Sequence, residues 1–181
     1  MSTIAPINPQ TADANTTKTL EAVRAKLGLV PNMVLTMAHS PTALGGYLQF
    51  SGALAGGKLS GRRREAIAIA VAQSNSCGYC LSAHTAIGQG LGLSSSDIAD
   101  ARRGRAADAA DAALVTLAQR IVATQGHPSA SDIAAFRAAG FSDGELLEVI
   151  ANVALNIYTN YVNHIAGTEI DFPVQSLELA A

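Results

Sequence analysis

The sequence is poor in the residues that mark several large classes of protein. Tryptophan is absent, aromatic residues make up 4% of the 181 residues, and charged residues make up only 14%. With a net charge of -2, the chain has neither the basic surface of a nucleic-acid-binding protein nor the acidic excess of a solvating tail. Because 49% of the residues are apolar, the chain can bury a core, and disorder over its whole length is excluded.

Long hydrophobic runs are also missing. The longest uninterrupted apolar run, Ala66 to Ala72, is far shorter than the roughly 20 residues that a membrane-spanning helix needs. The first 18 residues contain no apolar segment of the kind found in secretory signal peptides. We therefore expect no membrane partner, no nucleic-acid partner and a cytoplasmic location.

Alanine, in contrast, is abundant. It accounts for 35 of the 181 residues, and it is the strongest helix former, whereas the residues that favour strands are scarce. A chain of 18.5 kDa suits one domain, or two small similar lobes that share one core. The composition therefore predicts an all-α protein.

Helix start and stop signals divide the chain into segments. Gly28 ends the first expected helix, Pro31 opens the second, and Ser142 with Glu145 forms a capping box before the last. We expect helices over residues 17–27, 31–39, 41–56, 60–73, 77–90, 94–103, 108–125, 131–139 and 142–165. The expected organisation is a flexible N-terminal arm, a single all-helical domain and a C-terminal tail, over residues 1–16, 17–175 and 176–181.

One short pattern occurs twice. Residues 92–98 (GLSSSDI) resemble residues 140–146 (GFSDGEL), and each segment follows one expected helix and starts another. A glycine followed by a serine and an acidic residue is a common way to end one helix and cap the next. An internal duplication of a helical unit is the alternative explanation.

The only two cysteines, Cys77 and Cys80, lie in one Cys-x-x-Cys motif. A disulfide this short closes almost no loop, so the pair predicts redox chemistry or metal binding rather than a structural crosslink. Zinc needs four ligands and there is no second cysteine pair, so a zinc site would have to recruit histidines such as His84, with His39, His127 or His164. Two inert buried cysteines are the remaining alternative.

His84 and Glu65 are placed to assist the cysteines. On a helix, Cys77, Cys80 and His84 share one face, and the start of the helix stabilises a thiolate. At about 1.5 Å per residue, Glu65 lies roughly 15 Å of helix before residues 75–76 and His84 roughly 12 Å after them. An antiparallel hairpin turning near residues 75–76 would therefore bring its carboxylate opposite the imidazole. This arrangement predicts a nucleophilic thiolate with an imidazole nearby as its base.

The last helix carries a polar line in an apolar sequence. Asn152, Asn156, Asn160 and His164 recur every four residues. Since buried amides need partners, the line either meets a subunit interface or a structural network, or borders a pocket. Asn160 and His164 are the candidate pocket residues. The apolar positions around the rest of this helix predict a homo-oligomer.

The order Glu65, eleven residues, Cys77-x-x-Cys80, three residues, His84 resembles the active-site motif of the alkylhydroperoxidase D family, in the carboxymuconolactone decarboxylase-like superfamily. The resemblance covers about residues 18–175. Flanking segments that are similar to the peroxidase-related branch are residues 27–32 (LGLVPN), 39–41 (HSP), 160–164 (NYVNH) and 171–173 (DFP).

The resemblance implies an alkylhydroperoxidase D-like helical bundle that assembles as a trimer or hexamer. It also implies an antioxidant peroxidase that binds no haem, metal or other cofactor, takes hydroperoxides as substrates and uses an external dithiol or disulfide reductase. Cys80 would be the peroxidatic cysteine, Cys77 the resolving one, and His84 with Glu65 the proton relay. Tyr79 stands where the best-known members have a histidine, at the mouth of the dithiol.

Three points stay open at this stage. A muconolactone-type decarboxylase of the same superfamily would need no thiol pair, and a non-catalytic redox sensor would use the pair only as a switch. Proximity to the helix dipole favours Cys77 as the nucleophile, whereas proximity to His84 favours Cys80, which we prefer.

Overall fold

The computed structural model describes residues 2–179, and over this range the chain forms helices and no strand. The all-α fold predicted from the composition is therefore confirmed. No helix within the described range is long and apolar enough to cross a membrane. The elements are the 3-10 helix η1 (Pro9–Thr11) and the helices α1 (Ala14–Leu27), α2 (Asn32–Met37), α3 (Pro41–Ala55), α4 (Gly61–Ser74), α5 (Gly78–Gly90), α6 (Ser95–Arg102), α7 (Ala109–Ala123), α8 (Ala130–Ala138) and α9 (Asp143–Ala166).

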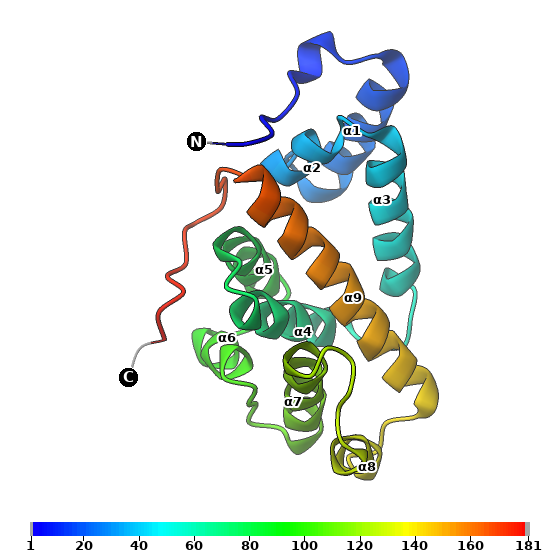
Figure 1. Cartoon of the computed structure of the whole chain (residues 1–181), viewed down its shortest axis with the longest axis vertical. Helices are drawn as coiled ribbons and strands as arrows, with labels where there is room; N and C mark the ends of the chain where they lie inside the picture. The colour runs from blue at the N-terminus through cyan, green and yellow to red at the C-terminus, as the bar shows by residue number, and fades with distance from the viewer. Residues whose placement is uncertain (1, 180–181) are drawn as a thin grey trace.

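Helix α4 forms the centre of the fold. It packs against α5, α6, α7 and α9, and its residues Ile67 to Ala72 are almost completely buried. The long apolar run in the sequence, Ala66 to Ala72, therefore forms the buried part of the central helix. Figure 1 shows α9 running along the molecule, with α1–α3 near one end and α7 and α8 near the other. Contacts of α9 with α2, α3, α4, α5 and α7 join these parts.

Serine side chains define where most helices begin. Each of five serines accepts a hydrogen bond from the backbone N–H three residues further on: Ser40, Ser60, Ser94, Ser129 and Ser142. Gly92 and Gly140, the first residues of the two segments that share a sequence pattern, have left-handed φ values of 86° and 94°. Glycine adopts this conformation without strain, so the repeated pattern has a local cause in ending one helix and capping the next.

The first long helix begins earlier than the sequence predicts. The carboxylate of Asp13 accepts hydrogen bonds from the N–H groups of Asn15 and Thr16, so α1 starts at Ala14 rather than at residue 17. The expected flexible arm therefore includes the first turn of α1. Residues before it also contact the domain, because the N–H of Thr3 donates to the carbonyl of Ala166 and that of Ile7 to the carbonyl of Leu35. Met1 lies outside the described residues.

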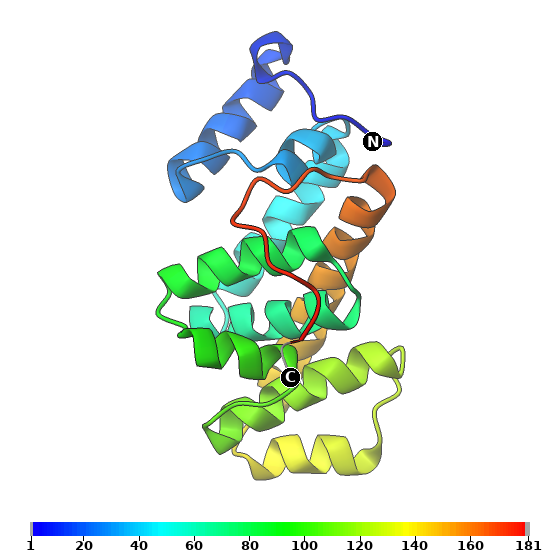
Figure 2. The ribbon, with the colours of Figure 1, turned by 90° about the vertical axis from the view of Figure 1, so that its left-hand side faces the viewer.

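After α9 the described chain forms no further helix, and it crosses the start of α5. Figure 2 shows this C-terminal segment running over the helices at the centre of the molecule. The N–H of Gln175 donates to Ser82 Oγ at 3.0 Å, and Gln73 Nε2 donates to the carbonyl of Leu177 at 3.0 Å. The described part of the expected tail, residues 176–179, is thus hydrogen-bonded to the helical domain. Residues 180 and 181 lie outside the described range.

Arg102 holds the C-terminal segment against the helical domain, so removing the Arg102 side chain should make that segment more mobile. Its Nη2 donates to the carbonyls of Ser176 and Glu178 at 2.7 and 3.1 Å. With about 1 kcal/mol for each of these two hydrogen bonds, Arg102→Ala should speed amide exchange across residues 172–179 roughly 30-fold. Hydrogen–deuterium exchange followed by mass spectrometry measures this.

The matched control is Arg105→Ala. Arg105 pairs with Asp100 at 3.1 Å on the surface, away from the C-terminal segment. Equal exchange rates in the two variants would show that Arg102 does not hold the segment.

Candidate functional site

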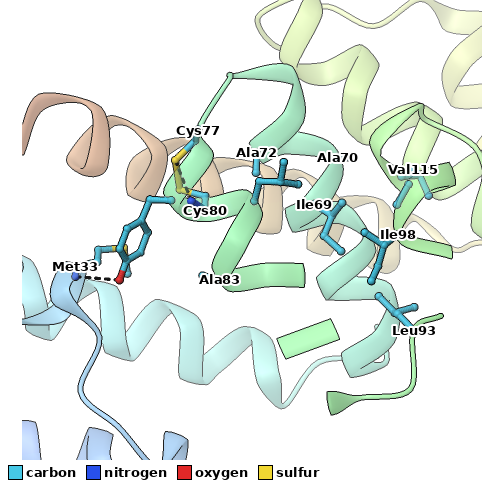
Figure 3. Close-up of a cluster of buried hydrophobic side chains, with 13 residues drawn as sticks. Met33, Ile69, Ala70, Ala72, Cys77, Cys80, Ala83, Leu93, Ile98 and Val115 are labelled. Carbon is cyan, nitrogen blue, oxygen red and sulfur yellow. Dashed lines mark hydrogen bonds between the residues drawn. A yellow bond between two sulfur atoms is a disulfide. The ribbon is translucent and has the colours of Figure 1, made fainter. Parts of the chain in front are cut away.

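The two cysteines stand at the start of α5. Cys77 is the N-cap, with its Sγ accepting a hydrogen bond from the N–H of Cys80 at 3.3 Å, and Cys80 occupies the first turn. The two residues are joined by a disulfide, with their Cα atoms 5.3 Å apart. Both are buried, with 1% and 2% of their surface exposed, in the core cluster drawn in Figure 3. The predicted redox pair is therefore close enough to cycle between dithiol and disulfide, although Cys77 caps the helix instead of lying within it.

A tight turn brings the end of α4 to this position. Ser76 has a left-handed φ of 54°, and the N–H of Cys77 donates to the carbonyl of Ala72 at 2.9 Å. The turn is held from a second helix, because Asn75 Nδ2 donates to Asn160 Oδ1 of α9 at 2.8 Å. The cap cysteine is thus fixed by contacts to both α4 and α9.

His84 and Glu65 meet as the hairpin geometry predicts. Nδ1 of His84 on α5 lies 2.7 Å from Oε2 of Glu65 on α4, with side-chain exposures of 23% and 16%. His84 follows Cys80 by four residues on the same helix, so the two side chains share a face. Since the carboxylate engages Nδ1, Nε2 is the ring nitrogen left to exchange a proton.

Two tyrosines lie near these groups. Burial, reinforced by the charge of Glu65, raises the pKa of Tyr47 on α3. Burial is also the main cause that raises the pKa of Tyr79, and the carboxylate of Asp171 adds to it. Both phenols therefore remain protonated near neutral pH and can donate hydrogen bonds but not act as bases. Tyr47 is a neighbour of the relay that the sequence did not reveal.

The sequence placed Tyr79 at the mouth of the dithiol, but the structure buries this residue. Only 5% of its surface is exposed. Its hydroxyl accepts a hydrogen bond from the N–H of Met33 at 3.2 Å, drawn as a dashed line in Figure 3. Its ring meets that of Phe172 edge-on, with the centroids 5.9 Å apart. The segment that follows α9 therefore covers this residue.

The structure also corrects one of the candidate pocket residues of α9. Asn160 is completely buried and bonds to Asn75, so it braces the turn before Cys77, whereas His164 is exposed. A four-residue spacing advances about 40° per step around a helix, so His164 lies about 120° from Asn152. The polar line therefore leaves the buried face before it reaches His164.

Asn163 takes the place expected for His164. Its Nδ2 lies 3.3 Å from Cys80 Sγ and 3.3 Å from Met33 Sδ, and the residue is 4% exposed. Asn163 lies only about 20° from Asn152 around the helix. Counting about 100° per residue from Asn152, instead of stepping by four, would have found it.

The histidines considered for a zinc site are dispersed. His84 is paired with Glu65, and Nε2 of His39 lies 2.9 Å from the carbonyl oxygen of Ala5. His127 follows α7, and His164 is exposed on α9. Within residues 2–179, no group of three or more histidine, cysteine, aspartate or glutamate side chains could hold a metal ion.

Comparison with known proteins gives a family match over the centre of the chain. Residues 41–123 match the carboxymuconolactone decarboxylase family. This stretch runs from the start of α3 to the end of α7 and includes Glu65, Cys77, Cys80 and His84. No curated protein matches the chain.

Several solved structures share the fold. An uncharacterized peroxidase-related protein from Silicibacter sp. TM1040 has a TM-score of 0.80 at 24% identity, covering 92% of each chain. A peroxidase-related protein from Ralstonia eutropha JMP134, described as an alkylhydroperoxidase AhpD core, has a TM-score of 0.81 at 23% identity, covering 94% of each chain. The debrominase Bmp8 in its apo form has a TM-score of 0.81 at 18% identity, covering 94% of this chain and 93% of its own. The all-α fold is therefore the one that these solved structures share, and residues 41–123 are similar to the carboxymuconolactone decarboxylase family.

Proposed function

We propose that the protein is a thiol-dependent peroxidase that reduces hydroperoxides through a dithiol–disulfide cycle of Cys77 and Cys80. One observation carries the proposal: the helix that begins with the Cys77–Cys80 disulfide also presents His84, whose Nδ1 lies 2.7 Å from Glu65. A redox pair alone would serve a switch. A pair with an oriented imidazole on the same helix face supports proton transfer during turnover.

In the first proposed step, the thiolate of Cys80 attacks the distal oxygen of a hydroperoxide, ROOH. The O–O bond breaks, Cys80 becomes a sulfenic acid, and RO⁻ leaves as the alcohol after it takes a proton. His84 Nε2 is suited to receive the thiol proton and return it to the leaving oxygen. Glu65 fixes the tautomer and stabilises the imidazolium that forms between the two transfers.

In the second proposed step, the thiol of Cys77 attacks the sulfenic sulfur of Cys80. The S–S bond forms and water leaves, which gives the disulfide present in the structure. An external dithiol or disulfide reductase then supplies two electrons and two protons by thiol–disulfide exchange. The cycle needs no bound cofactor and no metal, and it suits the cytoplasm, where thiol systems keep such pairs reduced.

Other thiol chemistry on this fold has to be distinguished. The debrominase Bmp8, in its complex with 2,3,4-tribromopyrrole, has a TM-score of 0.82 at 18% identity. This similarity concerns the fold and not the substrate. Oxidation of the pair once per chain without turnover would identify a redox sensor. Decarboxylation that survives loss of both thiols would identify a lyase.

The cysteine roles are tested by peroxide-dependent consumption of a dithiol. Cys80→Ser should abolish turnover, because it removes the attacking sulfur. Cys77→Ser should allow a single oxidation and leave a sulfenic acid on Cys80, which a dimedone reagent labels and mass spectrometry locates. Label on Cys77 in the Cys80→Ser protein, with none in the reciprocal variant, would reverse the assignment. Wild-type protein that consumes no dithiol with any hydroperoxide would refute the function.

The relay is tested by Glu65→Gln and His84→Ala. Each should slow turnover by about 10²–10⁴-fold, the usual scale for general acid–base groups, while the circular dichroism spectrum stays unchanged. The matched control is Glu148→Gln, since Glu148 accepts hydrogen bonds from the N–H groups of Lys58 and Leu59, away from the dithiol. That variant should lower the melting temperature and leave the rate constant unchanged. Full activity in the two relay variants would contradict the relay.

The outer face of α9 supports the proposed assembly of several copies. Residues 149–163 contain no charged residue, although the outward face of a surface helix normally carries charge. Large apolar side chains are exposed along it, namely Leu147 at 67%, Ile150 at 44%, Tyr158 at 39%, Tyr161 at 57% and Ile165 at 68%. With Ala151 and Ala154, most of these positions alternate in steps of four and three residues, the spacing by which two helices pack along a seam. We therefore propose that a second copy of the chain covers this face in a trimer or hexamer.

Light scattering tests the assembly. The wild-type protein should have a mass several times 18.5 kDa, and Tyr161→Glu should reduce it, because a charge would be buried at the centre of the seam. Leu27→Glu serves as the control, since Leu27 is an exposed leucine of α1, far from this face in sequence. A wild-type mass near 18.5 kDa would refute the proposal.

A further inference from the structure

The amide of Asn163 occupies an unusual position between two sulfur atoms. Nδ2 is 3.3 Å from Cys80 Sγ and 3.3 Å from Met33 Sδ, so these sulfurs come from α5 and α2 while the amide comes from α9. All three residues are at least nine-tenths buried. Three helices therefore converge on the sulfur of the cysteine to which we assign the attack.

The chemistry of the neighbours fixes which end of the amide faces them. A thioether sulfur and a disulfide sulfur carry no proton, so both can only accept a hydrogen bond. The NH₂ end of the amide has two N–H groups, one for each sulfur. When the disulfide is reduced, one of these N–H groups is already directed at Cys80 Sγ.

The other end of the amide is not used to hold the fold together. Oδ1 of Asn163 is buried and has no hydrogen-bond partner among the described residues. Buried asparagines that serve the structure have their oxygen or nitrogen bonded to protein, as Asn156 does through Nδ2 to the carbonyl of Asn152 at 2.8 Å. Among the described residues, the hydrogen bonds of the Asn163 side chain go to the two sulfurs alone.

We propose that Asn163 is a catalytic residue that holds Cys80 in its thiolate form by donating a hydrogen bond to Sγ. The inference rests on the proposed function in taking Cys80 as the attacking sulfur. Burial alone would favour the neutral thiol, because a low-dielectric environment disfavours charge. A fixed N–H donor opposes this effect, since hydrogen bonds to a charged acceptor are stronger than those to a neutral one.

Several other titratable groups lie on the segments around the buried cluster that contains Cys80. They are the relay pair His84 and Glu65, the phenols Tyr79 and Tyr47, the carboxylate Asp171 and, in the dithiol, Cys77. The backbone N–H of Cys80 points to Cys77 Sγ and not to Cys80 Sγ. The side-chain hydrogen bond that Cys80 Sγ accepts comes from Asn163. A substitution at Asn163 leaves all the other groups in place, so a comparison of variants isolates its contribution.

The experiment measures the thiolate directly and needs no peroxide. In a Cys77→Ser background, Cys80 is the only thiol, and its rate of alkylation by iodoacetamide follows the thiolate fraction. Asn163→Ala should move the pH profile of this rate to higher pH and slow alkylation at pH 7 about tenfold. Asn163→Asp should slow it further, because a carboxylate repels the thiolate. Asn156→Ala, which removes a buried amide of the same helix away from the sulfurs, should leave the profile where it is.

The outcomes separate this inference from the proposed function. An unchanged profile in Asn163→Ala, or an equal shift in Asn156→Ala, would overturn the role of Asn163 even if the protein proves to be a peroxidase. A shifted profile in a protein that reduces no hydroperoxide would support Asn163 and refute the peroxidase. If Asn163→Ala does not fold, Asn163→Leu fills the same volume without a donor and should give the same shift. A lower melting temperature with no shift would leave Asn163 a structural residue only.

Discussion

The hydrogen bond between Glu65 and His84 spans the antiparallel helices α4 and α5, and the packing of these two helices determines the rest of the site. The buried run Ile67–Ala72 keeps α4 at the centre of the fold, and the turn at residues 75–76 returns the chain at once. The helix that begins at the dithiol must therefore place its next turn against the carboxylate. A change in the length of this turn would shift α5 along α4 and separate His84 from Glu65, whereas Cys80 and His84 would keep their spacing because both lie on α5.

The surroundings of the dithiol show how a mostly apolar core tolerates polar chemistry. Cys77 and Cys80 are nearly inaccessible, and the polar groups around them come from different elements: Asn160 and Asn163 from α9, and Tyr79 from α5 itself. Asn160 holds the turn, and the Tyr79 hydroxyl is bonded to the backbone of Met33. Each of these three side chains thus makes at least one hydrogen bond, to a turn, to a backbone group or to a sulfur, within a core that is mostly apolar.

Local rules were enough to predict the helices and the relay but not the contacts made by distant segments. Composition, caps and the rise of about 1.5 Å per residue predict the all-α fold and the meeting of Glu65 with His84. The sequence placed Tyr79 at the mouth of the dithiol but could not predict its burial, because Phe172, which packs against its ring, comes more than 90 residues later in the chain. The choice of His164 was wrong because steps of four residues drift around a helix, and this drift brings Asn163 to the sulfur instead. Tyr47 could not be found, since nothing in the sequence relates α3 to Glu65.

The two cysteines receive different hydrogen bonds, and this difference bears on how the proposed cycle divides their roles. Cys77 Sγ accepts the N–H of Cys80, a donor built into the start of the helix, whereas Cys80 Sγ faces the amide of Asn163 and shares a face with His84. A sulfur stabilised as a helix cap is a good leaving group in thiol–disulfide exchange. On the proposed cycle, a reductant that attacks Cys80 would release Cys77 as the thiolate, and the same Cys80 would later attack the peroxide with His84 beside it. The dipole argument for Cys77 and the proximity argument for Cys80 then describe two different steps of one cycle.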